Sequence, residues 1–347
     1  MTNSKIHIIP TKLKRSIIPL IFLLFTISLI VFSKSNIKAA QNGLLLFANS
    51  VLPSLLPFFI ATELLGHTNI VYYLGRLLNG IMRPIFNIPG EGAFPFLMGI
   101  ISGYPTGAKI VADFKEKNIC TPIECERLIA FTNNSGPLFI VGTVGSGLFS
   151  NTSIGFLLLF THILACISVG FLFRFWKFKK AKNLRTSNLS ESIEIVNINN
   201  LGEVLGISIK KAISTTVMIG GFVVLFSVIN SMLDNIHFFD ILTNLFSSAF
   251  NIPKDYINGL FSGIIELTNG ISKVCVIPNK AISINIILCA FLLGFGGISV
   301  MLQVLSITSK NNISIKPYII GKLLHGFLAA LYTFIILQNS MIFNYDI

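Results

Sequence analysis

Long apolar runs separated by short polar segments dominate this chain of 347 residues and constrain its fold more than any other feature. The chain is 53% hydrophobic and 12% charged, whereas soluble domains carry about 25% charged residues. Runs of this length are typical of membrane-spanning helices. They lie at about 17–32, 43–66, 93–112, 128–149, 152–176, 207–230, 256–277, 281–305 and 317–337. The sequence predicts an all-α polytopic membrane protein and excludes a cytosolic enzyme and a disordered chain.

The net charge of +12 is distributed as in a membrane protein and not as in a nucleic-acid-binding one. Basic residues gather in the polar segments beside the apolar runs, where they orient a protein in its bilayer. Residues 1–15 are basic and carry no acidic residue, and no clear small-x-small cleavage site follows 17–32. We therefore interpret 1–42 as a retained, signal-anchor-like helix and loop with a cytoplasmic N-terminus, and not as a cleaved signal peptide.

The segments between the runs predict further elements. Two amphipathic stretches, 70–86 and 231–249, are too interrupted to span and predict interfacial helices. The basic stretch 177–206 predicts a cytoplasmic linker between a first unit, 43–176, and a second, 207–347. The five cysteines are scattered and show neither a disulfide framework nor a zinc spacing.

Four of the apolar runs contain polar, glycine-rich breaks that a simple spanning helix would not need. They read Ser-Gly-Tyr-Pro-Thr-Gly-Ala-Lys (102–109), Asn-Asn-Ser-Gly-Pro (133–137), Glu-Leu-Thr-Asn-Gly-Ile-Ser-Lys (266–273) and Gly-Phe-Gly-Gly-Ile-Ser (294–299). Non-helical backbone at membrane depth is tolerated only where protein or a water-filled cavity surrounds it. The breaks therefore predict one shared cavity.

The two halves of the chain repeat each other. The tetrapeptide Phe-Asn-Ile-Pro at 86–89 recurs at 250–253, an offset of 164, and the same offset aligns Lys109 with Lys273. These 24 aligned positions contain eight identities without a gap. The second pair of breaks corresponds at an offset of 160, which aligns Gly136 with Gly296. Apolar bias alone does not preserve such spacing, so we infer an internal repeat.

Charge counting predicts opposite orientations for the two repeats. If 93–112 and 256–277 are re-entrant hairpins that do not cross the bilayer, the basic linker lies in the cytoplasm and the C-terminus lies outside. The first repeat is then entered from outside and the second from inside. Two inverted-topology repeats, each with a re-entrant helical hairpin and a broken transmembrane helix, are typical of secondary transporters, whose solute site lies at the repeat interface.

Glu266 is the one carboxylate within the apolar runs of the second half. An ionisable group at membrane depth is costly, so it is a functional candidate as proton carrier, cation ligand or hydrogen-bond acceptor. The alternative is a structural ion pair with Lys273 or Lys109.

The breaks also favour an anion. The helix breaker Gly136-Pro137 and the glycines of 294–297 expose backbone N–H groups at the start of a half-helix. Lys109 and Lys273 lie near the breaks, where they either attract an anion or extend to the membrane interface. The predicted solute-binding residues are Ser102, Gly103, Tyr104, Thr106, Lys109, Asn133, Asn134, Ser135, Gly136, Glu266, Thr268, Asn269, Gly270, Lys273, Gly296, Gly297 and Ser299.

Other polar residues carry weaker signals. Gln303 fits a pore contact or a helix–helix bond, whereas His162 and His325 are interpreted as packing residues. Thr121 followed by Pro122 predicts a helix start. No phosphate loop, nucleophile elbow or metalloprotease spacing occurs, so we expect no enzyme, no catalytic residues, no metal and no cofactor.

The segments 99–109, 132–137, 266–270 and 294–300 resemble the sporulation integral membrane proteins of the YlbJ type, which carry nucleoside-recognition, or gate, repeats. The resemblance covers about 45–340. Such proteins are distantly similar to concentrative nucleoside transporters, which have the same paired hairpins and broken helices. The resemblance implies a role in spore maturation, a place in a membrane surrounding the forespore, and dipicolinate as solute. The residues themselves fit a small dicarboxylate but also a nucleoside or another organic anion.

These observations predict an alternating-access carrier of a small anionic solute in the lipid bilayer, with no nucleic-acid partner. Glu266 is the candidate for a coupling ion, either proton or sodium, and both a monomer and a homo-oligomer agree with the sequence. The rival interpretation is a non-transporting scaffold for a sporulation complex that uses the linker or 70–86. Polar breaks count against it, because a scaffold does not need them. A passive channel is a third alternative.

Overall fold

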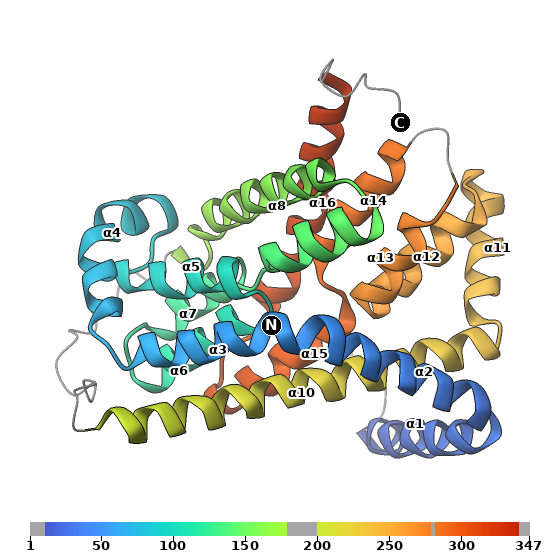
Figure 1. Cartoon of the computed structure of the whole chain (residues 1–347), viewed down its shortest axis with the longest axis horizontal. Helices are drawn as coiled ribbons and strands as arrows, with labels where there is room; N and C mark the ends of the chain where they lie inside the picture. The colour runs from blue at the N-terminus through green and yellow to red at the C-terminus, as the bar shows by residue number, and fades with distance from the viewer. Residues whose placement is uncertain (1–10, 179–199, 279–281, 340–347) are drawn as a thin grey trace, which may run out of the picture.

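The computed structural model describes residues 11–178, 200–278 and 282–339, which fold almost entirely into helices and contain no β-strand (Figure 1). The first half comprises α1 Thr11–Val31, α2 Ser33–Leu46, the π-helix η1 Phe47–Val51, α3 Leu52–Gly66, α4 Ile70–Phe86, the 3-10 turn η2 Gly90–Gly92, α5 Ala93–Ser102, α6 Thr106–Glu116, α7 Pro122–Ile129, the π-helix η3 Leu138–Leu148 and α8 Thr152–Phe173. The second half comprises α10 Leu201–Asn235, α11 Phe238–Phe250, α12 Lys254–Ile265, α13 Leu267–Cys275, α14 Ile282–Phe295, α15 Gly297–Thr308, the 3-10 turn η4 Ser309–Asn311 and α16 Lys316–Asn339.

Within the described residues, four helices are long and apolar enough to cross a membrane: Thr152–Phe173, Leu201–Asn235, Ser283–Asn311 and Lys316–Asn339. The number rises to six if two bent pairs each count as one span. One of these pairs joins α1 to α2 at 100°, and the other joins α4 to α5 at 89°. The predicted all-helical membrane architecture is therefore confirmed.

Both halves follow the same order of elements. A long helix (α2–η1–α3 or α10) is followed by a strongly amphipathic one (α4 or α11), a helical hairpin (α5–α6 or α12–α13), a broken helix (α7–η3 or α14–α15) and a closing helix (α8 or α16). The predicted amphipathic helix at 70–86 matches α4, but α11 begins only at Phe238, because α10 continues to Asn235. The hairpins at 93–112 and 256–277 are each two short helices packed side by side.

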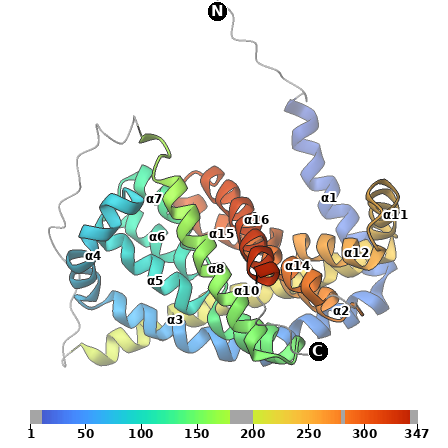
Figure 2. The same ribbon diagram turned by 90° about the horizontal axis from the view of Figure 1, so that it is seen from above.

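Two parts of the sequence prediction lie partly outside the described residues. In the predicted linker, 177–206, residues 179–199 lie outside the described part, and the C-terminal end is helical because α10 begins at Leu201. In the predicted N-terminal segment, 1–42, residues 1–10 lie outside it. The predicted first helix, 17–32, corresponds to α1. It extends away from the body of the molecule (Figure 2).

The helices form two groups, which we call the base and the hairpin layer. The base consists of α2, η1, α3 and α10, which run side by side along one edge of the molecule (Figure 1). Small residues allow the close approach: a Cβ on Gly220 would lie 2.8 Å from the ring of Phe47, and one on Gly43 would lie 3.1 Å from Val224 Cα. The hairpin layer consists of α5–α8, η3 and α12–α16.

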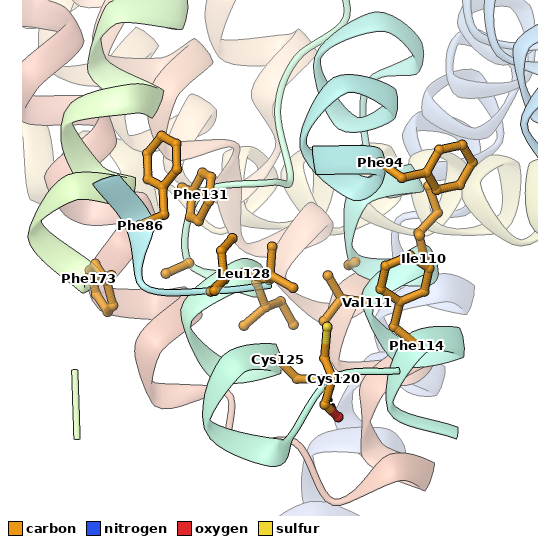
Figure 3. Packing of buried hydrophobic residues seen from close by; sticks show 14 of the residues in the cluster. Phe86, Phe94, Ile110, Val111, Phe114, Cys120, Cys125, Leu128, Phe131 and Phe173 are labelled. Carbon is orange, nitrogen blue, oxygen red and sulfur yellow. Dashed lines mark hydrogen bonds between the residues drawn. The ribbon is translucent and has the colours of Figure 1, made fainter. Parts of the chain in front are cut away.

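A hydrophobic core fixes the first hairpin and the first broken helix in the hairpin layer. Figure 3 shows Phe86 beside Phe131, and their rings stack with centroids 5.1 Å apart. Both side chains are at most 4% exposed, and burying a phenylalanine fully stabilises by about 1.5–3 kcal/mol. The end of α7, just before the break, is thereby held against α4 and α8.

Arg127 closes this core with a buried charge. Its guanidinium donates to Trp176 O at 3.1 and 2.9 Å and to Asn87 O at 2.6 Å, and the residue is 1% exposed. It therefore joins α7 to the end of α4 and to the turn after α8. The predicted helix start beside it is confirmed, since Thr121 caps α7 and Pro122 is its first residue.

We predict that Arg127→Ala lowers the melting temperature of the purified protein in detergent. The loss leaves two carbonyls unpaired, each at a cost on the order of 1–3 kcal/mol. Arg127→Lys should lie between wild type and alanine, because an ammonium lacks the fork that reaches both carbonyls. Arg83→Ala, at an exposed arginine of α4, is the matched control. Equal melting temperatures for the two alanine variants would contradict this role.

Candidate functional site

The tip of the first hairpin packs on the first break. Gly103, between α5 and α6, has φ +84°, and a Cβ there would lie 2.9 Å from the Gly136 nitrogen. A Cβ on Gly99 or Gly107 would collide with Thr132 O. Glycine is therefore required for the hairpin to reach the backbone of residues 130–137, which connects α7 to η3.

The same hairpin tip also contacts the second break. Tyr104 Oη donates to Leu293 O at 2.6 Å, and Ser135 Oγ lies 3.4 Å from the same oxygen. Leu293 is in the last turn of α14, just before Gly296, which has φ +84° and separates α14 from α15. The first hairpin and both breaks are therefore joined at one carbonyl.

The tip of the second hairpin is built around Glu266. Its carboxylate accepts from Thr268 N at 3.2 Å and from Asn269 N at 2.8 Å, which caps α13. Nearby, Gly297 at the start of α15 approaches Gly263 O and Leu267 N. Glu266 is 4% exposed. Two backbone N–H groups and the positive end of α13 thus offset the charge of this carboxylate.

A cavity of about 100 Å³ lies between the hairpin tips, the breaks and the base. Its polar lining comprises Ser102, Tyr104, Ser135, Glu266, Thr268, Ser299 and Gln303. The base contributes an apolar wall of Val51, Leu55, Phe58, Ile219 and Val223. We call this space the central cavity.

The structure brings some of the predicted site residues to the central cavity and leaves the others away from it. Those that line it are Ser102, Gly103, Tyr104, Ser135, Gly136, Glu266, Thr268 and Ser299. Asn133, Asn134, Gly270, Gly296 and Gly297 are not in its lining. The two asparagines are buried behind it, with Asn133 Nδ2 donating to Tyr318 Oη at 3.2 Å and Asn134 Nδ2 to Phe131 O at 3.0 Å. They hold the shape of the break. Gln303, for which a pore contact was one of two alternatives, does line the cavity.

The remaining predicted residues lie in two flanking cavities. Thr106 and Lys109 line one of about 280 Å³, the Lys109 cavity, between α3, α6 and α10. Asn269 and Lys273 line one of about 500 Å³, the Lys273 cavity, between α2, α10 and α13, and Thr268 contributes to both this and the central cavity.

Protein partners hold both lysines away from the central cavity. Lys109 forms an ion pair with Glu63 of α3 and donates to Thr215 Oγ1 at 3.1 Å. Lys273 donates to Asn258 Oδ1 at 2.9 Å and to Ser262 Oγ at 2.8 Å, and it lies 3.7 Å from Asp234. These contacts take the place of the alternative ion pair with Glu266, and a role of either lysine toward a solute stays a prediction. Glu63, which lies within the apolar run 43–66, was not among the predicted site residues.

Lys322 of α16 was not among the predicted site residues either. It is the centre of a buried polar cluster. Its Nζ lies 3.0 Å from Asn133 O, 3.4 Å from His325 Nδ1 and 3.5 Å from Tyr104 Oη. His325 in turn contacts His162 of α8, with ring centroids 4.3 Å apart. The histidines therefore belong to a hydrogen-bonded cluster and do more than pack. A lysine three residues before a histidine within the run 317–337 was the available signal.

Comparison with known proteins decides the family. The sporulation integral membrane protein YlbJ of Bacillus subtilis (strain 168) is 36% identical over 341 residues, which cover 94% of this chain and 83% of that protein. The chain belongs to the YlbJ family. A family model described as nucleoside recognition, or Gate, matches residues 48–175, which is nearly the whole first repeat unit.

Solved structures of the concentrative nucleoside transporter CNTnw share the fold. An intermediate state matches with a TM-score of 0.54 at 14% identity, covering 95% of this chain and 86% of that one. An inward-facing, substrate-bound state matches with a TM-score of 0.53 at 14% identity, covering 93% and 86%. The chain is thus an integral membrane protein of a sporulation family with a transporter-like fold.

We predict that Gly103→Ala destabilises the protein, because alanine adds a Cβ 2.9 Å from Gly136 N at a positive φ. The cost of the backbone conformation alone is about 1–3 kcal/mol. Gly80→Ala in α4, where a Cβ meets nothing within 4 Å, is the matched control and should be neutral or stabilising. Melting temperatures in detergent provide the measurement. A Gly103→Ala protein as stable as the control would show that the hairpin tip does not need its close contact with the break.

Proposed function

We propose that this protein carries a small organic anion, with dipicolinate as the first candidate, across a membrane surrounding the forespore by alternating access. The observation that carries the proposal is the central cavity, where both hairpin tips and both helix breaks meet. Polar, non-helical backbone at membrane depth is a feature of solute sites in secondary transporters. Dipicolinate enters through the YlbJ family resemblance, and the cavity chemistry supports its class.

Two half-helix starts at the central cavity favour an anion. The lining includes Leu138, the first residue of η3, and Ser299, in the first turn of α15. Helix N-termini carry partial positive charge and unpaired N–H groups, which stabilise carboxylates. The carboxylate of Glu266 in the same lining is neutralised in part by the N-terminus of α13. It therefore does not exclude an anionic solute.

The flanking cavities support alternating access. The Lys109 and Lys273 cavities are related by the internal repeat, and each lies between one hairpin and the base. A shift of the hairpin layer along the base would connect the central cavity to one of them at a time. Lys117 and Lys211 line the Lys109 cavity, so we place that cavity toward the cytoplasm by the positive-inside rule. The N-terminus is then cytoplasmic, the C-terminus external, and the repeats inverted.

Two alternatives follow from specific observations. A nucleoside-like solute is favoured by the description of the family model and by the fold shared with CNTnw. A scaffold for a sporulation complex would use the linker or the amphipathic helix α4, whose Tyr73 and Leu77 side chains are exposed. A scaffold, however, does not need a polar cavity between glycine-rich breaks.

We predict saturable dipicolinate uptake into liposomes that contain the purified protein. Glu266→Ala should lower this uptake at least about fivefold, because α13 loses a capping interaction of about 1 kcal/mol at the wall of the cavity. Glu203→Ala, at an exposed glutamate in the first turn of α10, is the matched control and should transport normally.

The outcomes separate the alternatives. Uptake of uridine with no uptake of dipicolinate would replace the anion by a nucleoside. Flux of dipicolinate that does not saturate would indicate a channel. No flux of either solute, under proton and sodium gradients, together with normal sporulation of cells carrying Glu266→Ala, would decide for the scaffold.

A further inference from the structure

Lys322 is a buried cation without an anionic partner. It is 1% exposed, and among the ion pairs of the described residues none involves it. Its Nζ meets only neutral groups: the Asn133 carbonyl, a ring nitrogen of His325, and the hydroxyl and ring face of Tyr104, whose centroid is 5.0 Å away. An unpaired buried charge is costly. The stability of the charged, ammonium form of Lys322 therefore depends on the other charges near it.

Hydrogen bonds assign the protons of the two histidines. His325 Nε2 lies 3.0 Å from His162 O, a pure acceptor, so this nitrogen carries a proton and Nδ1 presents its lone pair to Lys322. His162 Nε2 accepts from Ser135 N at 3.2 Å, so the proton of His162 is on Nδ1. Both imidazoles are neutral in this arrangement, and Lys322 donates a hydrogen bond to His325 Nδ1.

Within the part of the chain that the structure describes, the rest of the surroundings supplies no charge. The other titratable side chains that face the cluster are Tyr104 of the first hairpin, Tyr318 of α16 and Cys166 of α8. A phenol or thiol is uncharged at neutral pH. Since the imidazole rings are 4.3 Å apart and Lys322 is 3.4 Å from His325, repulsion limits the cluster to a single positive charge.

Two residues of the cluster are also walls of the central cavity. Tyr104 contacts Lys322 and lines the cavity, and Ser135 contacts His162 and lines it too. An anion in the cavity would lie one side chain away from Lys322. Opposite charges attract strongly across such a short, poorly solvated distance. Anion binding and proton binding therefore favour each other, and by linkage the effect is equal in both directions.

We propose that Lys322, His325 and His162 form a proton-binding site that couples anion transport to proton movement. A proton from the water on the entry side is bound together with the anion, both cross with the hairpin layer, and both are released on the exit side. The empty carrier returns with the cluster neutral. This inference rests on the proposed function, because the anion is the partner that stabilises the ammonium.

Liposomes that hold a pH-sensitive dye test the proposal. In sodium-free medium, wild-type protein should acidify the lumen as dipicolinate enters, and an inward proton gradient should drive its accumulation. Lys322→Arg retains the charge but cannot release the proton. It should exchange labelled for unlabelled dipicolinate while net, gradient-driven uptake falls about tenfold or more, within the usual range of coupling energies. Lys316→Arg, at the exposed start of α16, is the matched control and should behave as wild type.

Two results would overturn the proposal while leaving the carrier function intact. In the first, wild-type uptake leaves the lumenal pH unchanged. In the second, both Lys322→Arg and Lys322→Met still move protons with the solute, which would assign the proton to another group such as Glu266.

A solute-free measurement separates failure of the site from failure of the proposed function. If wild-type protein moves no dipicolinate, the melting temperatures of wild type and Lys322→Met are compared over the range of pH in which both proteins stay folded. A proton-binding Lys322 makes the difference between the two proteins change with pH. A constant difference would overturn the proposal.

Discussion

The fold depends on satisfying backbone polar groups at the four breaks between helices within a membrane. Each break leaves carbonyl and N–H groups without helical partners, and lipid offers none. The protein solves this by bringing the ends together. Leu293 O accepts from Tyr104 of the opposite repeat, Asn133 O accepts from Lys322, and the N–H groups at the start of α13 are bound by Glu266. Because each repeat satisfies groups of the other, neither central break is complete without both halves of the chain.

The glycines follow from this constraint. Thr132 O lies where a Cβ of Gly99 or Gly107 would be, so the first hairpin packs with its backbone directly on the break. A close approach of this kind leaves no room for water around the carbonyls. The central cavity lies where these packed ends meet, so the candidate site coincides with the point at which the two repeats contact each other.

The repeat and its breaks could be predicted from sequence because they depend on local spacing. The recurrence of Phe-Asn-Ile-Pro located both hairpins, and the glycine-rich segments located the cavity. The lysines could not be assigned in this way. Whether Lys109 faces a solute depends on Glu63, a residue 46 positions away on another helix. Lys322 was hidden for two reasons: its run lacks a break, and its partners outside α16 lie on the first hairpin and the first break, far away in the sequence.

The two repeat-related lysines differ in a way that bears on the mechanism. Lys109 joins the first hairpin to the base through a pair with Glu63 whose side chains are 21% and 11% exposed, whereas Lys273 approaches Asp234 of the base at 3.7 Å with both side chains more than a third exposed. An exposed pair contributes little to stability, and the attraction within a pair grows as water is excluded from it. The first hairpin is therefore fastened to the base more firmly than the second. Under alternating access, the two end states would differ in which hairpin is held more firmly to the base, and Lys322 would move with the hairpin layer.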